Sequence, residues 1–130
     1  MSARAQSNKK QHRPVVMVID DNPEIAEALQ ISIGRTYELV YCKDSESIEQ
    51  NLTPDVRAVL LDIKMDFQSG VDLFSHLKKK RDDLPIIFHS AYPGGEETAR
   101  VANQLPHSGY LIKGKYSRVE LLETIAATIN

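Results

Sequence analysis

The chain has 130 residues, of which 42% are hydrophobic and 26% charged, and its formal net charge is -2. This length and composition are typical of one globular domain with a substantial core, and they exclude a largely disordered chain. No apolar run approaches the roughly 18 residues that a membrane helix needs, which excludes a membrane-spanning protein.

Charge is unevenly distributed along the chain. Residues 1–13 carry four basic side chains and no acid, whereas the rest has 12 basic and 18 acidic side chains, a net -6. We expect residues 1–13 to be a flexible basic tail, or alternatively a short electrostatic arm, before a folded domain over residues 14–130. The acidic body argues against direct nucleic-acid binding. The single Cys42 and the missing signal-peptide core lead us to expect a cytoplasmic protein.

The first predicted elements are a strand, a helix and a second strand. Residues 15–19 are apolar throughout, as in a strand buried on both faces. Asn22 suits the N-cap of the following helix, Pro23 its first position and Gly34 its end. Residues 37–41 alternate in polarity and predict an outer strand.

The middle of the chain contains a weaker helix pattern and a strong strand pattern. A short helix is predicted to begin at Asp44 or Ser45, with Ile48 and Leu52 on one face and Pro54 closing it. The apolar run 56–61 is the predicted central strand.

A third helix and a fourth strand follow. Ser69 and Asp72 predict a capping box at the start of this helix. The basic run Lys78–Arg81 falls in its last turn, where cations complement the helix dipole, and we interpret it so rather than as a binding patch. Pro85 introduces a strand over residues 86–89.

The chain ends with a helix, a strand and another helix. Residues 98–105 have helical apolar spacing, residues 110–112 form a short apolar run, and Ser117 and Glu120 predict a second capping box. Strand and helix therefore alternate five times, which predicts an α/β fold with a parallel sheet flanked by helices.

Polar side chains stand at the ends of four of these strands. Because the carboxyl ends of parallel strands share one edge, we expect these side chains to converge there. Crowded carboxylates repel one another unless a divalent cation joins them, and oxygen-rich sites suit magnesium. Carboxylates, a metal, a hydroxyl and an ammonium together can receive a phosphoryl group. The residues are Asp20, Asp21, Asp62, Ser90 and Lys113.

Over residues 14–130 these motifs resemble the receiver domain of two-component response regulators. The matching segments are Val18–Asn22, Leu61–Met65 with Gly70 beyond it, Ser90–Ala91 and Tyr110–Lys113. The resemblance implies a doubly wound (βα)5 flavodoxin-like fold, a five-stranded parallel sheet in the order 2-1-3-4-5. It also implies a signalling domain in a phosphorelay rather than an enzyme, with self-dephosphorylation as its one catalytic property.

The resemblance further implies a role for each site residue. Asp62 is the expected phosphoacceptor, taking its phosphoryl group from a sensor histidine kinase or a histidine phosphotransfer protein. The expected cofactor is Mg2+, bound by Asp21, Asp62 and the backbone carbonyl of Lys64, with Asp20 acting mostly through bound water. Ser90 and Lys113 are expected to hold phosphoryl oxygens.

Two further roles follow from the same resemblance. Tyr110 is the expected rotating aromatic that, with Ser90, reports phosphorylation to a surface of the fourth helix, fifth strand and fifth helix. Lys64 and Tyr92 are expected to tune the lifetime of the phosphoryl group. That surface would act on a downstream protein target or an effector domain, with the chain as a monomer or weak dimer.

The chain departs from the family pattern at three positions. Asp66 and Gly114 replace prolines, and Ser90 replaces the commoner threonine. We expect Asp66 to point to solvent, whereas the peptide bond before Gly114 stays open as cis or trans. His76, His89 and His107 lack metal-ligand spacing and are interpreted as structural or surface residues, with His89 packing near the site.

Two other functions remain open at this point. A magnesium-dependent phosphatase of the haloacid dehalogenase type also uses a strand-end aspartate. Its chemistry generally requires a second aspartate two positions later, and this chain has Asn22 two positions after Asp20 and Lys64 two positions after Asp62. The second alternative is a receiver-like interaction module that works without phosphorylation. A stand-alone regulator and a receiver excised from a larger protein are equally compatible with the sequence.

Overall fold

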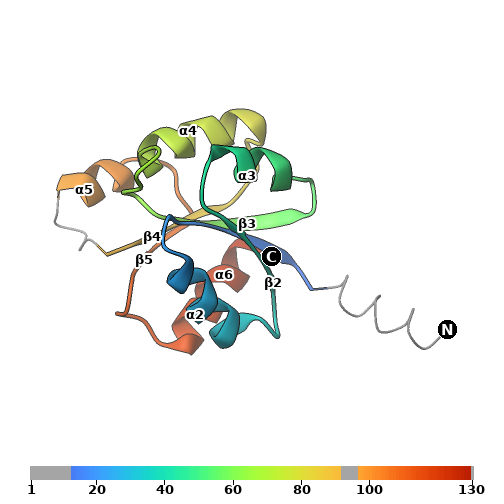
Figure 1. Ribbon diagram of the computed structural model, residues 1–130. Helices are drawn as coiled ribbons and strands as arrows, with labels where there is room; N and C mark the ends of the chain where they lie inside the picture. Colours follow the sequence, from blue (N-terminus) through green and yellow to red (C-terminus); the bar gives the residue numbers. More distant parts are fainter. Residues whose placement is uncertain (1–12, 92–96, 130) are drawn as a thin grey trace.

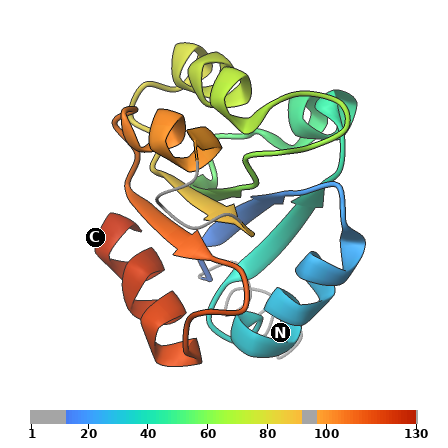
Figure 2. The same ribbon diagram turned by 90° about the vertical axis from the view of Figure 1, so that its left-hand side faces the viewer.

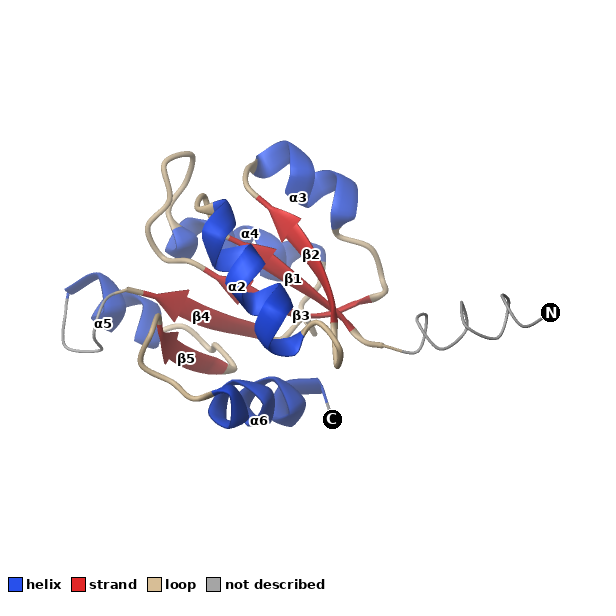
Figure 3. Ribbon diagram, turned by 60° about the horizontal axis from the view of Figure 1, so that its bottom comes forward, coloured by secondary structure: helices blue, strands red, loops and turns tan. Residues whose placement is uncertain are grey.

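The computed structural model describes residues 13–91 and 97–129, which form one parallel five-stranded sheet in the order β2-β1-β3-β4-β5. This confirms the predicted order 2-1-3-4-5, and all strand pairs run in the same direction (Figure 3). The strands are β1 (Val15–Ile19), β2 (Glu38–Cys42), β3 (Val56–Leu61), β4 (Ile86–Ser90) and β5 (Gly109–Ile112).

Helices cover both faces of the sheet (Figures 1 and 2). Three helices lie over one face and two over the other, so the molecule has three layers, as expected for a doubly wound α/β protein. The first group is α3 (Ser45–Asn51), α4 (Gly70–Lys80) and α5 (Glu97–Asn103), and the second is α2 (Pro23–Ile33) and α6 (Arg118–Ile129).

Alternating side chains of the central strands build a core on each face. Met17 and Ile19 of β1 pack with α3 and α4, whereas Val16 and Val18 pack with α2 and α6. Because both faces are covered, β1 and β3 are almost continuously apolar, as the sequence predicted. Cys42 is fully buried as a small apolar side chain in the core on the α3 and α4 side of the sheet.

The predicted caps are present. Asn22 accepts a hydrogen bond from Glu24 N, and Pro23 is the first residue of α2. The short helix α3 is confirmed, with Asp44 rather than Ser45 as its N-cap. Ser69 accepts from Asp72 N at the start of α4, at 3.1 Å, which is the N-cap half of the predicted capping box.

The basic run at the end of α4 is tied to the fold. Lys78 Nζ donates to Leu84 O at 2.6 Å, and a guanidinium nitrogen of Arg81 donates to Val56 O at 2.6 Å. These bonds join the end of α4 to the entrances of β3 and β4, so Lys78 and Arg81 have a structural role, through contacts that the sequence did not predict.

One local feature differs from the predicted pattern. Val101, which has the spacing of the inward face of α5, is 44% exposed, whereas the next residue, Ala102, is fully buried. The helix α5 lies near β5, at the edge of the sheet (Figure 2), and Ala102 and Leu105 are the described residues of this region that pack in the core. Arg13, the last residue of the predicted tail, hydrogen-bonds to Gly34 O.

Within the described ranges, no helix is both long and apolar enough to cross a bilayer.

Candidate functional site

The backbone brings the predicted site residues to one edge of the sheet. Asp62 N donates to Ile19 O at 3.0 Å, which continues the pairing of β3 with β1 and places Asp62 beside Asp20. Lys113 N donates to Ser90 O at 2.7 Å in the same way and aligns the ends of β5 and β4. Four strand ends therefore converge, as the sequence predicted.

Three carboxylates crowd this edge. One oxygen from each of Asp20, Asp21 and Asp62 lies within 4.8 Å of the others. Asp20 is 1% exposed and Asp62 5%, whereas Asp21 faces solvent. This donor set of hard oxygens fits a divalent cation such as Mg2+, which binds carboxylates and keeps several waters.

Lys113 is the cation that faces the two buried carboxylates. Its Nζ lies 2.8 Å from Asp20 Oδ2 and 3.4 Å from Asp62 Oδ2. Burial lowers the pKa of Lys113, but the hydrogen bond to Asp20 and the charges of Asp62 and Asp20 outweigh burial and raise it. The lysine therefore remains an ammonium at neutral pH.

Asp62 is held in an environment that disfavours its charge. Burial and the neighbouring charge of Asp20 raise its pKa from 3.8 to about 6, against the opposing effect of Lys113. A strongly perturbed carboxyl at a strand end is typical of functional sites. A cation bound among the three carboxylates would favour the ionised form.

The loop between β3 and α4 completes the site with backbone groups. Asp66 N donates to Asp21 Oδ2 at 3.1 Å, while Asp66 itself is exposed, as expected. Gly70 N donates to Ile63 O at 2.6 Å, and a Cβ at Gly70 would lie 2.2 Å from Asp62 O. Only glycine allows this close return of the chain.

The remaining predicted residues surround this centre. Ser90 is fully buried at the end of β4, and Lys64 is exposed in the loop after Asp62. Tyr110 is half-buried on the α5 side, with its ring centroid 6.3 Å from that of Phe88. The bond between Lys113 and Gly114 is trans, since the described residues contain no cis peptide. Tyr92 lies outside the described residues.

One polar pair beside the site was not predicted. His89 is 3% exposed, and its Nε2 lies 2.7 Å from the hydroxyl of Tyr116. Burial and the charge of Lys113 lower the pKa of His89 to about 4, so it is neutral at pH 7. A histidine within an apolar strand was the only sequence signal, and nothing indicated its partner.

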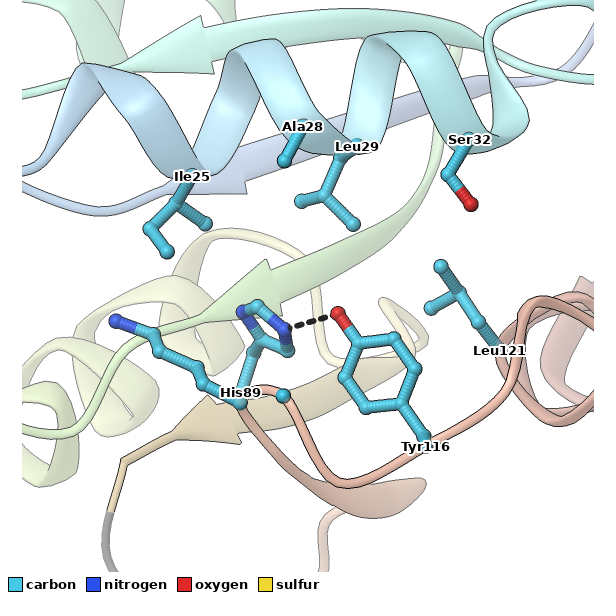
Figure 4. Close-up of a pocket in the computed structure, with 9 residues that line it drawn as sticks. Ile25, Ala28, Leu29, Ser32, His89, Tyr116 and Leu121 are labelled. Atoms are coloured by element: carbon cyan, nitrogen blue, oxygen red, sulfur yellow. Dashed lines mark hydrogen bonds between the residues drawn. The ribbon is translucent and has the colours of Figure 1, made fainter.

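This pair borders a pocket of about 280 Å3 between α2 and the turn that leads into α6. Figure 4 shows the hydrogen bond between His89 and Tyr116 on one side and the apolar side chains of α2 on the other. Lys113 and Gly114 also line the pocket, which therefore adjoins the carboxylate cluster.

Comparison with known proteins agrees with this geometry. Residues 16–126 match the family profile described as the response regulator receiver domain. An uncharacterized transcriptional regulatory protein of Bacillus subtilis, YrkP, is 31% identical over 77 residues, which are 58% of this chain. The matched region is 33% of that relative, so this chain corresponds to about a third of its length.

Solved structures share the fold at lower identity. A signal receiver domain from Bacteroides fragilis superposes with a TM-score of 0.78 at 21% identity, covering 89% of this chain and 96% of that one. A response regulator receiver domain protein from Clostridium thermocellum has a TM-score of 0.77 at 22% identity, with coverages of 89% and 94%. The response regulator TrrA of Thermotoga maritima, in complex with Mg2+-BeF, has a TM-score of 0.71 at 24% identity, with coverages of 88% and 97%.

Proposed function

The chain belongs to the response regulator receiver domain family, and we propose that Asp62 is its phosphoacceptor. The observation that carries this proposal is the position of Asp62, which is buried beside Asp20 and 3.4 Å from the ammonium of Lys113. The donor is a phosphohistidine on a sensor histidine kinase or a histidine phosphotransfer protein.

The transfer forms one bond and breaks one. A carboxylate oxygen of Asp62 attacks phosphorus, and the bond from phosphorus to the imidazole nitrogen of the donor breaks. The electron pair of that bond leaves with the imidazole, and an acyl phosphate remains on Asp62. The chain contributes chiefly positioning and charge, which is how phosphoryl transfer is usually catalysed.

Lys113 and Ser90 act on the transferred group. The ammonium of Lys113 offsets charge on the phosphoryl oxygens, and the hydroxyl of Ser90, at the neighbouring strand end, donates a hydrogen bond to one of them. Both groups stand at strand ends, so the backbone that carries them is ordered before the transfer.

Mg2+ is the cofactor that the carboxylate cluster suits. Asp21, Asp62 and the backbone carbonyl of Lys64 would hold it, with Asp20 acting mainly through bound water. When bound, the ion supplies positive charge to the carboxylates and to the phosphoryl oxygens. The complex of the related TrrA with Mg2+-BeF supports this choice of metal.

Phosphorylation would be reported through Ser90 and Tyr110. A phosphomonoester, used as a proxy, adds roughly -1.5 to -2 charge, which draws the Ser90 hydroxyl towards Asp62. The half-buried ring of Tyr110 then rotates inward and changes the surface of α5, β5 and α6. Converting a 1:99 mixture into 99:1 takes about 5.5 kcal/mol of differential stabilisation. The altered surface acts on a downstream protein or effector domain.

Lys64 and Tyr92 would set the lifetime of the acyl phosphate. Lys64 is exposed two residues after Asp62, where its side chain can border the path of an attacking water. Dephosphorylation rates of the Lys64→Ala and Tyr92→Ala variants test this role. Rates equal to those of the parent would remove it.

Incubation with acetyl phosphate and Mg2+ tests the function itself. A protein adduct that forms only with Mg2+ is the expected result. Rapid turnover of small phosphate esters would instead indicate a phosphatase, and no reaction would indicate an interaction module that works without phosphorylation.

A further inference from the structure

The hydrogen bond between His89 and Tyr116 joins the two segments that carry Ser90 and Lys113. His89 immediately precedes Ser90 in β4, and Tyr116 lies three residues after Lys113, in the turn before α6. The two side chains meet at 2.7 Å, with ring centroids 5.6 Å apart. A partly buried polar bond of this kind restrains the separation of the two segments.

The turn after Lys113 needs such an anchor. Gly114 has φ of 76°, and a Cβ there would meet nothing within 4 Å, so this residue is required for its backbone conformation and not for space. Backbone bonds from Lys113 N to Ser90 O and from Lys115 N to Ile112 O hold the start of the turn. At its far end, Leu121 N donates to Ser117 O at the start of α6, and Tyr116 packs against the core on that side of the sheet.

Tyr116 packs against this core on part of its surface and borders a pocket on the rest. The pocket of about 280 Å3 lies between Tyr116 and helix α2 (Figure 4), so the Tyr116 ring has open space on one side. The wall opposite the ring consists of Ile25, Ala28, Leu29 and Ser32. The hydrogen bond between the Tyr116 hydroxyl and His89 therefore provides a directional contact that the open side of the ring lacks.

His89 also interacts with Lys113 itself. Burial and the Lys113 charge lower the pKa of His89 to about 4, which keeps the ring neutral beside the ammonium. A neutral imidazole can hydrogen-bond to the Tyr116 hydroxyl without repelling Lys113. The pair is thus compatible with the charge next to it.

We infer that His89 and Tyr116 are positioning residues, whose hydrogen bond holds the Lys113 turn so that the ammonium reaches Asp20 and Asp62. This inference rests on the proposed role of Lys113 in phosphoryl transfer to Asp62. It adds two residues, from the α2 and α6 side of the sheet, that act through Lys113 and do not touch the phosphoryl group.

Tyr116→Phe is the cleanest test, because it removes the hydroxyl and keeps the ring. We expect phosphorylation by acetyl phosphate with Mg2+ to slow about fivefold, the effect of losing one hydrogen bond. Tyr37→Phe is the matched control, since Tyr37 belongs to the same apolar core but precedes β2, at the opposite edge of the sheet. This control should phosphorylate at the parental rate.

A second readout follows the position of Lys113 without any reaction. In the metal-free protein, the nitrogen chemical shift of the Lys113 ammonium should move in Tyr116→Phe and stay unchanged in Tyr37→Phe. His89→Gln, whose amide can still bond to Tyr116, should keep the parental shift and rate, whereas His89→Leu should change both. In a Lys113→Ala background, Tyr116→Phe should have no further effect on the rate.

The outcomes separate this inference from the proposed function. A parental protein that forms no adduct would defeat the proposed function, while the Lys113 shift would still decide the inference. An adduct with an unchanged rate and an unchanged Lys113 shift in Tyr116→Phe would overturn the inference alone. A rate effect that persists in the Lys113→Ala background would also overturn it.

Discussion

The ammonium of Lys113 lies closer to Asp20, at 2.8 Å, than to Asp62, at 3.4 Å. One cation therefore offsets two buried carboxylates, and the third, Asp21, adds further negative charge. Burial, together with this imbalance, raises the pKa of Asp62, and the imbalance also explains the fit of the cluster to a divalent cation.

Replacement of Lys113 by methionine should raise the pKa of Asp62 further. Lys113 now lowers that pKa against burial and Asp20, so its loss should move the value above about 6 in the metal-free protein. Carboxyl carbon chemical shifts recorded across a pH series measure it. Lys115→Met, an exposed neighbour, is the control and should leave the titration unchanged. An Asp62 pKa at or below the parental value in Lys113→Met would contradict this.

Asp62→Asn should stabilise the metal-free protein at neutral pH. Because the folded-state pKa is raised from 3.8 to about 6, ionisation of Asp62 destabilises the fold as the pH rises through this range. A shift of this size corresponds to up to about 3 kcal/mol, and the gain should vanish near pH 3.5 to 4, where Asp62 is protonated. Urea unfolding with EDTA checks the gain.

The parent protein and the Asp62→Asn variant should respond differently to Mg2+. A cation that binds only the folded carboxylate cluster stabilises it by mass action. The parent should gain stability as Mg2+ is added, and Asp62→Asn should gain much less. Equal gains in both proteins would place the metal elsewhere.

His89 should make the protein less stable in mild acid. Its pKa is about 4 in the folded state and 6.5 when unfolded, so below pH 6.5 the unfolded chain binds a proton that the folded chain does not. Stability should fall by up to about 3 kcal/mol between pH 6.5 and 4. In His89→Gln this part of the pH dependence should be absent, whereas His76→Gln, at an exposed position, should keep it.

Gly70→Ala should disturb both folding and the site. The added Cβ would lie 2.2 Å from Asp62 O and 2.7 Å from Ile63 Cα, so backbone must move. We expect a loss of about 1 to 3 kcal/mol, measured by urea unfolding, and slower phosphorylation. Gly114→Ala, where space is open and only the positive φ is strained, should lose about 1 kcal/mol. A Gly70→Ala protein as stable as the parent would refute the close-approach argument.

The carboxylate site was predictable because parallel strands align their ends. Apolar runs locate the strands, so Asp20, Asp62 and Lys113 could be assigned to one edge before any coordinates were known. The helix caps at Asn22 and Ser69 were predictable because each depends on residues within one helical turn.

Other contacts depend on distant residues that no local pattern connects. The bond between His89 and Tyr116 spans 27 positions, and that from Asp66 N to Asp21 spans 45. Val101 fits the helical period yet is exposed, in a helix that lies at the edge of the sheet near β5. Periodicity identifies the face of a helix but not how much of that face is covered.

The most direct test of the account is to locate the acyl phosphate. After treatment with acetyl phosphate and Mg2+, borohydride reduction converts an aspartyl phosphate to homoserine, which peptide mass spectrometry can place. The account predicts homoserine at position 62 in the parent and in Asp66→Asn, and none in Asp62→Asn. Homoserine at Asp20, Asp21 or Asp66 instead, or at no position, would contradict it.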